Sequence, residues 1–336
     1  MLSFFTVVLT LVTAVLAKSR ISPPQGALIV GRGYHTTIQG AVDALNSTQT
    51  HAEQIIFIYP GIYHEQVTID SIKSPLTIYG YSNNTHSYAA NQVTIVAGHS
   101  QKDRPHNEST ATLRAKTANF KLYNVNVVNS FGEGSQALAL SAYENNQGYY
   151  ACSFKGFQDT VLAQKGSQLY TSCYIEGATD FIFGQGANAW FERCTIGVLP
   201  ASVGYITASG RNTEDSPSYY VFNRAIIGAA IGQKVQAGLY YLGRPWRSHA
   251  RVAFQYSFMT NVINSAGWSV WNSPKDDRIE HASFGEHGNT GPGATGKRAS
   301  FSKTLEHELH MGDILGQNYT SEYYYDSSYV RPSSTA

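Results

Sequence analysis

The sequence is poor in charged residues and in long apolar runs. Only 14% of its 336 residues are Asp, Glu, Lys or Arg, against roughly a quarter in an average globular protein. A disordered, highly charged chain and a coiled coil rich in Glu, Lys and Arg are therefore excluded. The 24 basic residues nearly balance the 23 acidic ones, which leaves no excess of positive charge for binding nucleic acid. We expect no nucleic-acid partner.

The one long apolar run covers residues 2–17 and ends in Ala17, followed by Lys18. It is shorter than the roughly 18 residues that a membrane span requires. Its small final residue is typical of a cleavage site. We predict that residues 1–17 are a secretory signal peptide, the alternative being a buried N-terminal helix. The mature protein is then expected to be secreted, extracellular and without a membrane partner.

Cysteine and metal-ligand motifs are also scarce. Three cysteines are too few for a disulfide framework in a protein of this size. The 11 histidines form no His-Glu-x-x-His motif, and there is no Cys-x-x-Cys pair, so we expect no metal and no cofactor. Four Asn-x-Ser/Thr sequons agree with export, and their occupancy stays open; they begin at Asn46, Asn83, Asn107 and Asn318.

The three cysteines instead mark a repeat. Cys152, Cys173 and Cys194 are spaced by 21 residues, each with an aromatic residue three positions before it and an apolar one two positions after it. Weaker copies lie at 120–125, 222–227 and 254–259. A fixed period of about 20–30 residues in strand-like text predicts the stacked coils of a parallel β-helix. The cysteines would form an interior ladder of small side chains, with a disulfide between neighbours as the alternative.

The ends of such a stack must be covered. A helix over residues 36–45 is predicted to close the first coil, because Thr36 and Gln39 have capping-box spacing. Its apolar face would consist of Ile38, Ala41, Val42 and Leu45. We expect one β-helical domain over residues 18–325 and a flexible, Ser- and Thr-rich tail over 326–336.

The same period relates two carboxylates. Asp159 lies seven residues after Cys152, and Asp180 lies seven after Cys173. If the coils stack in register, the two Asp are neighbours, one layer of about 4.8 Å apart. Two carboxylates that close cannot both ionise easily, which places a neutral acid beside an anionic nucleophile. The alternative is a structural role in a turn.

An arginine in a Pro-containing turn is the candidate third charge of this group. Arg244 lies in the segment Leu242-Gly-Arg-Pro-Trp246. Within reach of one Asp, its guanidinium would keep that carboxylate ionised and leave the other Asp to carry the proton.

Five motifs, in this order, resemble those of the pectin methylesterase (pectinesterase) family, and of its fungal, secreted members in particular: Gly61-Ile-Tyr63-His-Glu65, Gln136-Ala-Leu-Ala-Leu140, Gly156-Phe-Gln-Asp-Thr160, Asp180-Phe-Ile-Phe-Gly184 and Leu242-Gly-Arg-Pro-Trp246. The resemblance extends from about residue 34 to the region of Gly267 and Trp268. It implies an all-β, right-handed parallel β-helix, in agreement with the repeat. It also implies a monomeric carboxylic ester hydrolase that releases methanol from methyl-esterified pectin. We interpret the first motif as a structural turn between coils.

The resemblance implies a role for each matching residue. Asp180 resembles the nucleophile, which forms an aspartyl acyl-enzyme, a mixed anhydride. Asp159 resembles the general acid that protonates departing methanol and then the base that activates water. Gln158 resembles the transition-state stabiliser, Gln136 the oxyanion and substrate-binding residue, and Arg244 the residue that orients Asp180. The aromatic side chains expected to contact substrate are Trp246, Phe183 and Trp271.

Three positions depart from the commonest pattern of the family, which leaves the subsite preference open: Ser141, Phe157 and Thr179. Two other functions also stay open. A β-helical pectin depolymerase would require either calcium-binding acidic clusters or paired acids set at an anomeric carbon. An inactive sugar-binding solenoid would keep the aromatic residues without needing the two Asp and the Arg.

Overall fold

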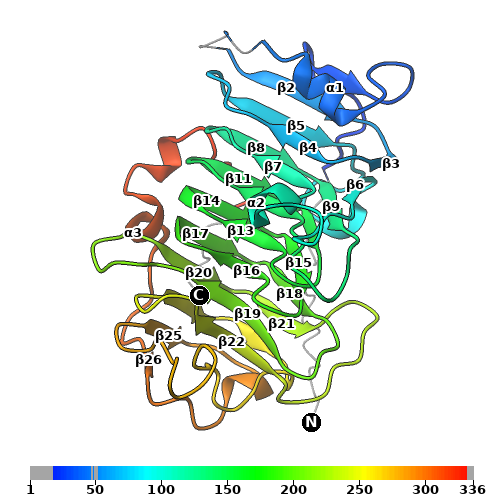
Figure 1. Cartoon of the computed structure of the whole chain (residues 1–336). Coiled ribbons are helices and arrows are strands. Elements are labelled where there is room, and N and C mark those ends of the chain that lie inside the picture. The colour runs from blue at the N-terminus through cyan, green and yellow to red at the C-terminus, as the bar shows by residue number, and fades with distance from the viewer. Residues whose placement is uncertain (1–17, 47, 49–51, 331–336) are drawn as a thin grey trace, which may run out of the picture.

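The computed structural model describes residues 18–46, 48 and 52–330. The predicted signal peptide, 1–17, lies outside this range, as do the last six residues of the predicted tail. The named strands pair in parallel into three long sheets, stacked coil upon coil (Figure 1). This confirms the predicted parallel β-helix. Among the described residues, no helix has the length and apolar character needed to cross a membrane.

From β2 to β22 each coil contributes one strand to each sheet, and the strands before and after this range extend sheets 1 and 2. Sheet 1 contains β1 (Leu28–Val30), β2 (Gln54–Ile58), β5 (Leu76–Gly80), β8 (Phe120–Tyr123), β11 (Gln147–Tyr150), β14 (Lys165–Thr171), β17 (Gly186–Glu192), β20 (Tyr219–Asn223), β23 (Arg251–Gln255), β25 (Ser283–His287) and β26 (Ser302–Thr304). Sheet 2 contains β3 (Gly61–His64), β6 (Val93–Ala97), β9 (Val125–Asn129), β12 (Ser153–Lys155), β15 (Tyr174–Gly177), β18 (Thr195–Val198), β21 (Ile226–Ala229) and β24 (Phe258–Met259). Sheet 3 contains β4 (Val67–Ile69), β7 (Leu113–Ala115), β10 (Leu140–Ala142), β13 (Val161–Ala163), β16 (Ile182–Gly184), β19 (Gly204–Ser209) and β22 (Tyr240–Pro245). The helices are α1 (Ile38–Asp43), α2 (Asn107–Thr110) and α3 (Met311–Leu315), with 3₁₀ turns η1 (Tyr88–Ala90), η2 (Pro292–Ala294) and η3 (Tyr319–Ser321).

The corners between the sheets have different lengths. From β8 onward the corner from sheet 1 to sheet 2 is short, and one residue of it has a left-handed φ in coil after coil: Asn124, Ala151, Ser172, Arg193, Arg224 and Tyr256. The corner from sheet 2 to sheet 3 is longer in the central coils. It holds Asp159 between β12 and β13 and Asp180 between β15 and β16. The polar side chains of the site are therefore carried by this second corner.

The core consists of columns of equivalent side chains, one from each coil. One column is aromatic, with neighbouring ring centroids 4.3 to 4.7 Å apart, and contains Tyr149, Tyr170, Phe191, Phe222 and Phe254. A second column consists of the cysteines, which are fully buried and free of disulfides. The interior cysteine ladder is thus confirmed. The alternative of a disulfide between neighbouring coils is not observed.

The weaker repeat copy at 120–125 belongs to sheet 1, but two residues away from the register that its sequence suggests. Tyr149 pairs with Leu122, whereas Phe120 pairs with Gln147. Because side chains alternate with a period of two, a shift of two residues keeps the same side chains facing inward. Phe120 is accordingly buried too. The sequence pattern alone could not distinguish these two registers.

The aromatic column should contribute strongly to stability. Phe191 is fully buried between Tyr170 and Phe222. We expect Phe191→Ala to lower the free energy of unfolding by about 3–5 kcal/mol, because the ring is lost and a cavity remains. Urea denaturation followed by circular dichroism measures the change. The exposed Tyr34 provides the control Tyr34→Ala, and equal losses in both variants would contradict the prediction.

Helix α1 covers the first coil as predicted, although it is shorter than the range 36–45. Its N-cap is Thr37, whose Oγ1 accepts a hydrogen bond from the backbone N–H of Gly40 at 3.0 Å. Thr36 was the wrong candidate for the N-cap, because the helix begins at Ile38. The side chain of Gln39 does not turn back to close a capping box. That side chain instead donates to Asp43 and to the backbone oxygen of Thr68.

The first motif is not a turn. It forms β3, and its last residue, Glu65, caps α1 from outside the helix. The Glu65 carboxylate accepts hydrogen bonds from the backbone N–H groups of Ile38 and Gln39 at 2.8 and 2.9 Å. An anion at a helix N-terminus satisfies donors that have no partner within the helix. The motif therefore couples the corner after β3 to the covering helix and is structural, as expected.

The chain beyond β26 returns along the outer face of sheet 1, seen in orange and red in Figure 1. The predicted flexible tail is packed over residues 326–330. Tyr329 is 5% exposed and stacks on His86, with ring centroids 4.6 Å apart. Asp326 accepts a hydrogen bond from the hydroxyl of Tyr123 at 2.9 Å. The Ser- and Thr-rich composition of this segment predicted flexibility and gave no indication that Asp326 and Tyr329 attach it to the β-helix.

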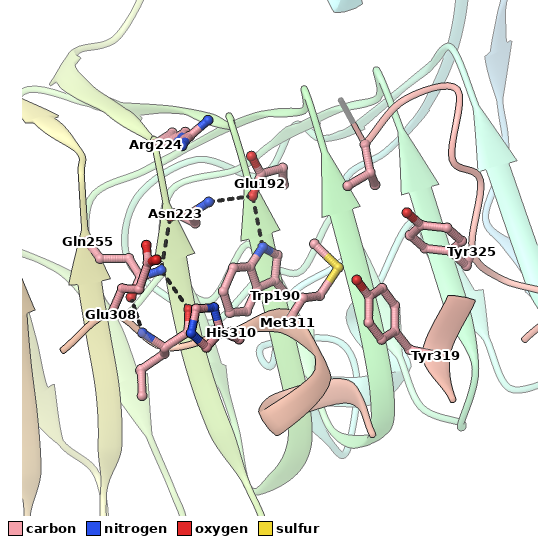
Figure 2. Close-up of a pocket in the computed structure, with 12 residues that line it drawn as sticks. Trp190, Glu192, Asn223, Arg224, Gln255, Glu308, His310, Met311, Tyr319 and Tyr325 are labelled. Atoms are coloured by element: carbon pink, nitrogen blue, oxygen red, sulfur yellow. Dashed lines mark hydrogen bonds between the residues drawn. The ribbon is translucent and has the colours of Figure 1, made fainter. Parts of the chain in front are cut away.

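A hollow of about 350 Å³ remains between this returning segment and sheet 1. Figure 2 shows its lining, which includes Trp190, Glu192, Asn223 and Gln255 on the sheet side and His310, Met311, Tyr319 and Tyr325 on the other. The polar groups on the sheet side hydrogen bond to one another and to the returning chain. For example, Trp190 Nε1 donates to Glu192 at 2.9 Å, and Gln255 bonds both backbone groups of Leu309. These contacts attach the segment to the sheet.

Candidate active site

All eight residues predicted for the site line one cavity. It has a volume of about 210 Å³ and lies against the outer side of sheet 3. The residues that line it are Asn107, Gln136, Gln158, Asp159, Asp180, Phe183, Ala208, Arg244, Trp246 and Trp271. Residues separated by up to 164 positions thus meet at a single place, because each coil returns to the same face.

The two carboxylates are related by one coil, as the 21-residue period predicts. Gln158 pairs with Thr179 in a parallel bridge, and the N–H of Asp159 donates to the carbonyl of Thr179 at 3.1 Å. Both Asp have a left-handed backbone, with φ of 64° at Asp159 and 51° at Asp180. Asp tolerates this conformation better than most residues. The corner can therefore present the same side chain to the same cavity on two successive coils.

The floor of the cavity comes from three neighbouring strands of sheet 3. Phe183 in β16 pairs with Ala208 in β19, which pairs with Arg244 in β22. Phe183 and Ala208 belong to an apolar cluster separate from the core, which also includes Ala111, Leu138 and Leu162, with Trp246 and Trp271 packed against it. The register therefore places an arginine at the edge of an apolar patch.

Arg244 holds Asp180 through two parallel hydrogen bonds. Its Nε and Nη2 donate to the two oxygens of Asp180 at 2.9 and 2.7 Å. Its Nη1 donates to the backbone oxygen of Trp271 at 2.9 Å. The guanidinium lies 4.0 Å from the ring centroid of Tyr205 and 4.3 Å from that of Trp271. Planar contacts of this kind fix the guanidinium and, through it, the Asp180 carboxylate.

The two carboxylates differ in their electrostatic environment. Each Asp is only 6% exposed. Burial raises the pKa of Asp159 well above its usual range, and the charge of Asp180 raises it further, against the opposing effects of Arg244 and Asn107. Burial also raises the pKa of Asp180, but its hydrogen bonds to Arg244 and the charge of Arg244 counteract the rise. Two carboxyl groups this close are coupled in their ionisation, and these environments favour the proton on Asp159 and the negative charge on Asp180.

Arg244 itself stays charged in this pocket. Burial lowers the pKa of its guanidinium, but the hydrogen bonds to Asp180 and the charge of Asp180 raise it more, so that the pKa lies above its ordinary value. The arrangement therefore favours one partly buried cation, one buried anion and one neutral acid. Such a group can attack an electrophilic carbon and deliver a proton to the departing atom.

Sequence reasoning missed three residues of the site. Asn107, noted only as a sequon, donates from Nδ2 to Oδ2 of Asp159 at 3.0 Å. Ala208 and Tyr205 belong to no motif, and the register of β19 between β16 and β22 is what places them here. Of these three residues, the sequence pattern marked only Asn107, and it marked it as a possible glycosylation site.

Comparison with known proteins agrees with this geometry. The pectinesterase family model matches residues 28–327. A pectinesterase from Aspergillus aculeatus is 49% identical over 320 residues, covering 94% of this chain and 95% of that protein, and one from Aspergillus niger is 46% identical over the same shares. The crystal structure of the pectin methylesterase from Aspergillus niger in penultimately deglycosylated form superposes with a TM-score of 0.86 at 36% identity, covering 93% of this chain and 100% of that one. The chain is therefore a carboxylic ester hydrolase that belongs to the pectinesterase family and is similar to its fungal members.

Proposed function

We propose that this enzyme hydrolyses the methyl esters of galacturonate units in pectin, through an aspartyl acyl-enzyme, and releases methanol and de-esterified pectate. The observation that carries the proposal is the asymmetric acid pair: Arg244 donates to both oxygens of Asp180 and so favours its anion, and Asp159, its neighbour one coil away, favours the protonated form. Family membership supports the same conclusion. No cofactor takes part in the proposed steps.

In the first half-reaction, the Asp180 carboxylate attacks the ester carbonyl carbon. The carbonyl oxygen becomes an oxyanion, and we assign its stabilisation to the side-chain amides of Gln136 and Gln158, a role supported by their place in the lining of the cavity. As the bond from carbon to the methoxy oxygen breaks, Asp159 gives its proton to that oxygen, and methanol leaves. The products are a mixed anhydride on Asp180 and an ionised Asp159.

In the second half-reaction, water hydrolyses the anhydride. The Asp159 carboxylate takes one proton from the water, and the resulting hydroxide equivalent attacks the acyl carbon. The bond to the Asp180 oxygen breaks, which restores the Asp180 carboxylate and its hydrogen bonds to Arg244. The galacturonate leaves as a free carboxylic acid that ionises, and Asp159 is again protonated for the next turnover.

The walls of the cavity suit a methyl ester on a sugar. The apolar patch around Phe183 and Ala208 gives the methyl group an apolar site. Trp246 and Trp271 border this patch and remain partly exposed, so their rings are available to a sugar face. A free carboxylate at the same position would lie against apolar side chains and the Asp180 anion, which favours release of the product.

The test uses the purified protein and highly methylated pectin. We expect methanol release without a fall in polymer length, measured by a coupled alcohol oxidase assay and by size-exclusion chromatography. Chain scission with or without methanol would support a depolymerase instead. Pectin binding without methanol release would support an inactive sugar-binding solenoid.

We further propose that the protein acts outside the cell as a monomer. The apolar segment 2–17 and the sequons support export. N-terminal sequencing of protein from the culture medium checks this, with Lys18 expected as the first residue. Light scattering of the same sample checks the monomer.

A further inference from the structure

We infer that Asn107 is a positioning residue for the general acid: its side-chain amide favours one oxygen of Asp159 as the carrier of the proton. The inference rests on the proposed function, in which Asp159 is that acid. It is drawn from the contacts of Asn107 itself, a residue outside the five motifs and 52 positions from Asp159 in the sequence.

The contact with Asp159 is the main polar interaction of this side chain. Asn107 Nδ2 donates to Asp159 Oδ2 at 3.0 Å. The other end of the amide, Oδ1, is buried and has no hydrogen-bond partner among the described residues. A buried amide oxygen without a donor lowers stability. Asn107 thus hydrogen bonds to a reacting group while its own Oδ1 lacks a partner, which lowers stability. Such a local loss of stability is expected at a functional position.

The short helix α2 holds Asn107 firmly in place. The hydroxyl of Thr110 donates to the backbone oxygen of Asn107 at 2.7 Å and accepts from the N–H of Leu138 at 3.1 Å. The buried side chain of Asn129 donates to the backbone oxygens of Thr110 and Leu138. Gln66, from an earlier coil, donates to the backbone oxygens at both sides of Thr110. The donor is therefore supported by three separate coils.

The chemistry follows from the donor character of an amide nitrogen. Nδ2 has hydrogens to give and no lone pair to accept with. The carbonyl oxygen of a protonated carboxyl accepts a hydrogen bond better than its hydroxyl oxygen does, so the contact to Oδ2 favours the acidic proton on Oδ1 of Asp159. Asn107 thus favours Oδ1 as the oxygen from which the proton passes to departing methanol. The same contact favours the ionised form of Asp159, which is the form that acts as base in the second half-reaction.

The charged groups around Asp159 determine how an Asn107 variant should change the pKa of Asp159. Those that act on it are Asp180, which raises its pKa, and Arg244, which lowers it. Both remain in an Asn107 variant. Loss of the amide donor removes one influence that lowers the pKa of Asp159, so this pKa should rise. Since kcat/KM requires protonated Asp159, its alkaline limb reports this pKa and should move to higher pH.

The experiment compares two substitutions of nearly the same shape. Asn107→Leu removes the donor without adding charge, and Asn107→Asp replaces it by an anion facing Asp159. We expect kcat/KM at the wild-type optimum to fall about 10- to 100-fold in Asn107→Leu, the loss that one hydrogen bond to a charged group entails. The alkaline limb should lie at higher pH in Asn107→Leu than in wild type, and at still higher pH in Asn107→Asp. Asn83→Leu, at an exposed asparagine outside the cavity, should leave rate and profile unchanged.

A second readout separates this inference from the proposed function. The infrared carbonyl band of protonated Asp159, assigned by its loss in Asp159→Asn, should persist to higher pH in Asn107→Leu than in wild type. This titration requires no turnover. If the wild type released no methanol, the proposed function would fail while the infrared titration still tested the contact. An alkaline limb and an infrared titration that coincide with those of wild type would overturn the inference.

The same geometry requires that Asn107 carry no glycan. It begins a sequon, but its Nδ2 is the atom that a glycan would modify, and it lines the cavity. The other three sequon asparagines, Asn46, Asn83 and Asn318, are exposed. Peptide mapping by mass spectrometry of active enzyme from a glycosylating host should find Asn107 unmodified. An occupied Asn107 in fully active enzyme would overturn the inference independently.

Discussion

Asp180→Asn should reduce methanol release by about four orders of magnitude or more, because an amide cannot attack the ester and form the anhydride. Asp159→Asn should reduce it by about 10²- to 10⁴-fold, the usual contribution of a general acid or base. A coupled assay for methanol measures both losses. Circular dichroism of each variant shows whether the β-helix is retained. A rate near that of wild type in either variant would remove the residue from the mechanism.

The two substitutions should have opposite effects on stability. The pKa of Asp159 is higher in the folded protein than in the unfolded chain, so its contribution to stability is present at low pH and is lost as pH rises through the folded-state value. Asp159→Asn removes this dependence and should raise Tm at neutral pH. Asp180→Asn leaves Arg244 buried without its counter-ion and should lower Tm. Equal shifts in Tm would contradict the assignment of the anion to Asp180.

Arg244→Gln should lower kcat/KM by about a hundred- to a thousandfold, the effect of removing one partner of a buried ion pair. Arg244 counteracts the rise in the pKa of Asp180 that burial causes. Without the guanidinium this pKa rises, and Asp180 stays protonated to higher pH. The acidic limb of kcat/KM should therefore move to higher pH, which a pH profile of methanol release measures.

Arg244→Lys separates charge from geometry. Lysine keeps the positive charge but loses the two parallel hydrogen bonds and the flat contacts with Tyr205 and Trp271. Its activity should lie between those of wild type and Arg244→Gln. Arg224→Gln, at an arginine that lines the hollow under the C-terminal segment, is the control. An unmoved acidic limb in Arg244→Gln would show that Arg244 does not hold Asp180 ionised.

The sequence by itself determined the period of the coil and the relation between the two carboxylates. A 21-residue spacing that recurs in cysteines, aromatic residues and Asp predicts that Asp159 and Asp180 are neighbours, and the register confirms it. This works because every coil of a parallel β-helix meets the next in the same way. Residues one period apart in the sequence therefore lie next to each other on neighbouring coils. The five motifs extended the prediction to Gln136, Gln158 and Arg244, all of which line the cavity.

Only the tertiary structure decided which contacts these residues make. The two hydrogen bonds from Arg244 to Asp180 join residues 64 positions apart. The hydrogen bond from Asn107 to Asp159 joins residues 52 positions apart. Neither distance is a multiple of the 21-residue period, because the intervening coils have loops of different length. A repeat predicts contacts between equivalent positions. Contacts between a strand, a corner and a one-turn helix depend on how those loops fold, and so they had to be observed.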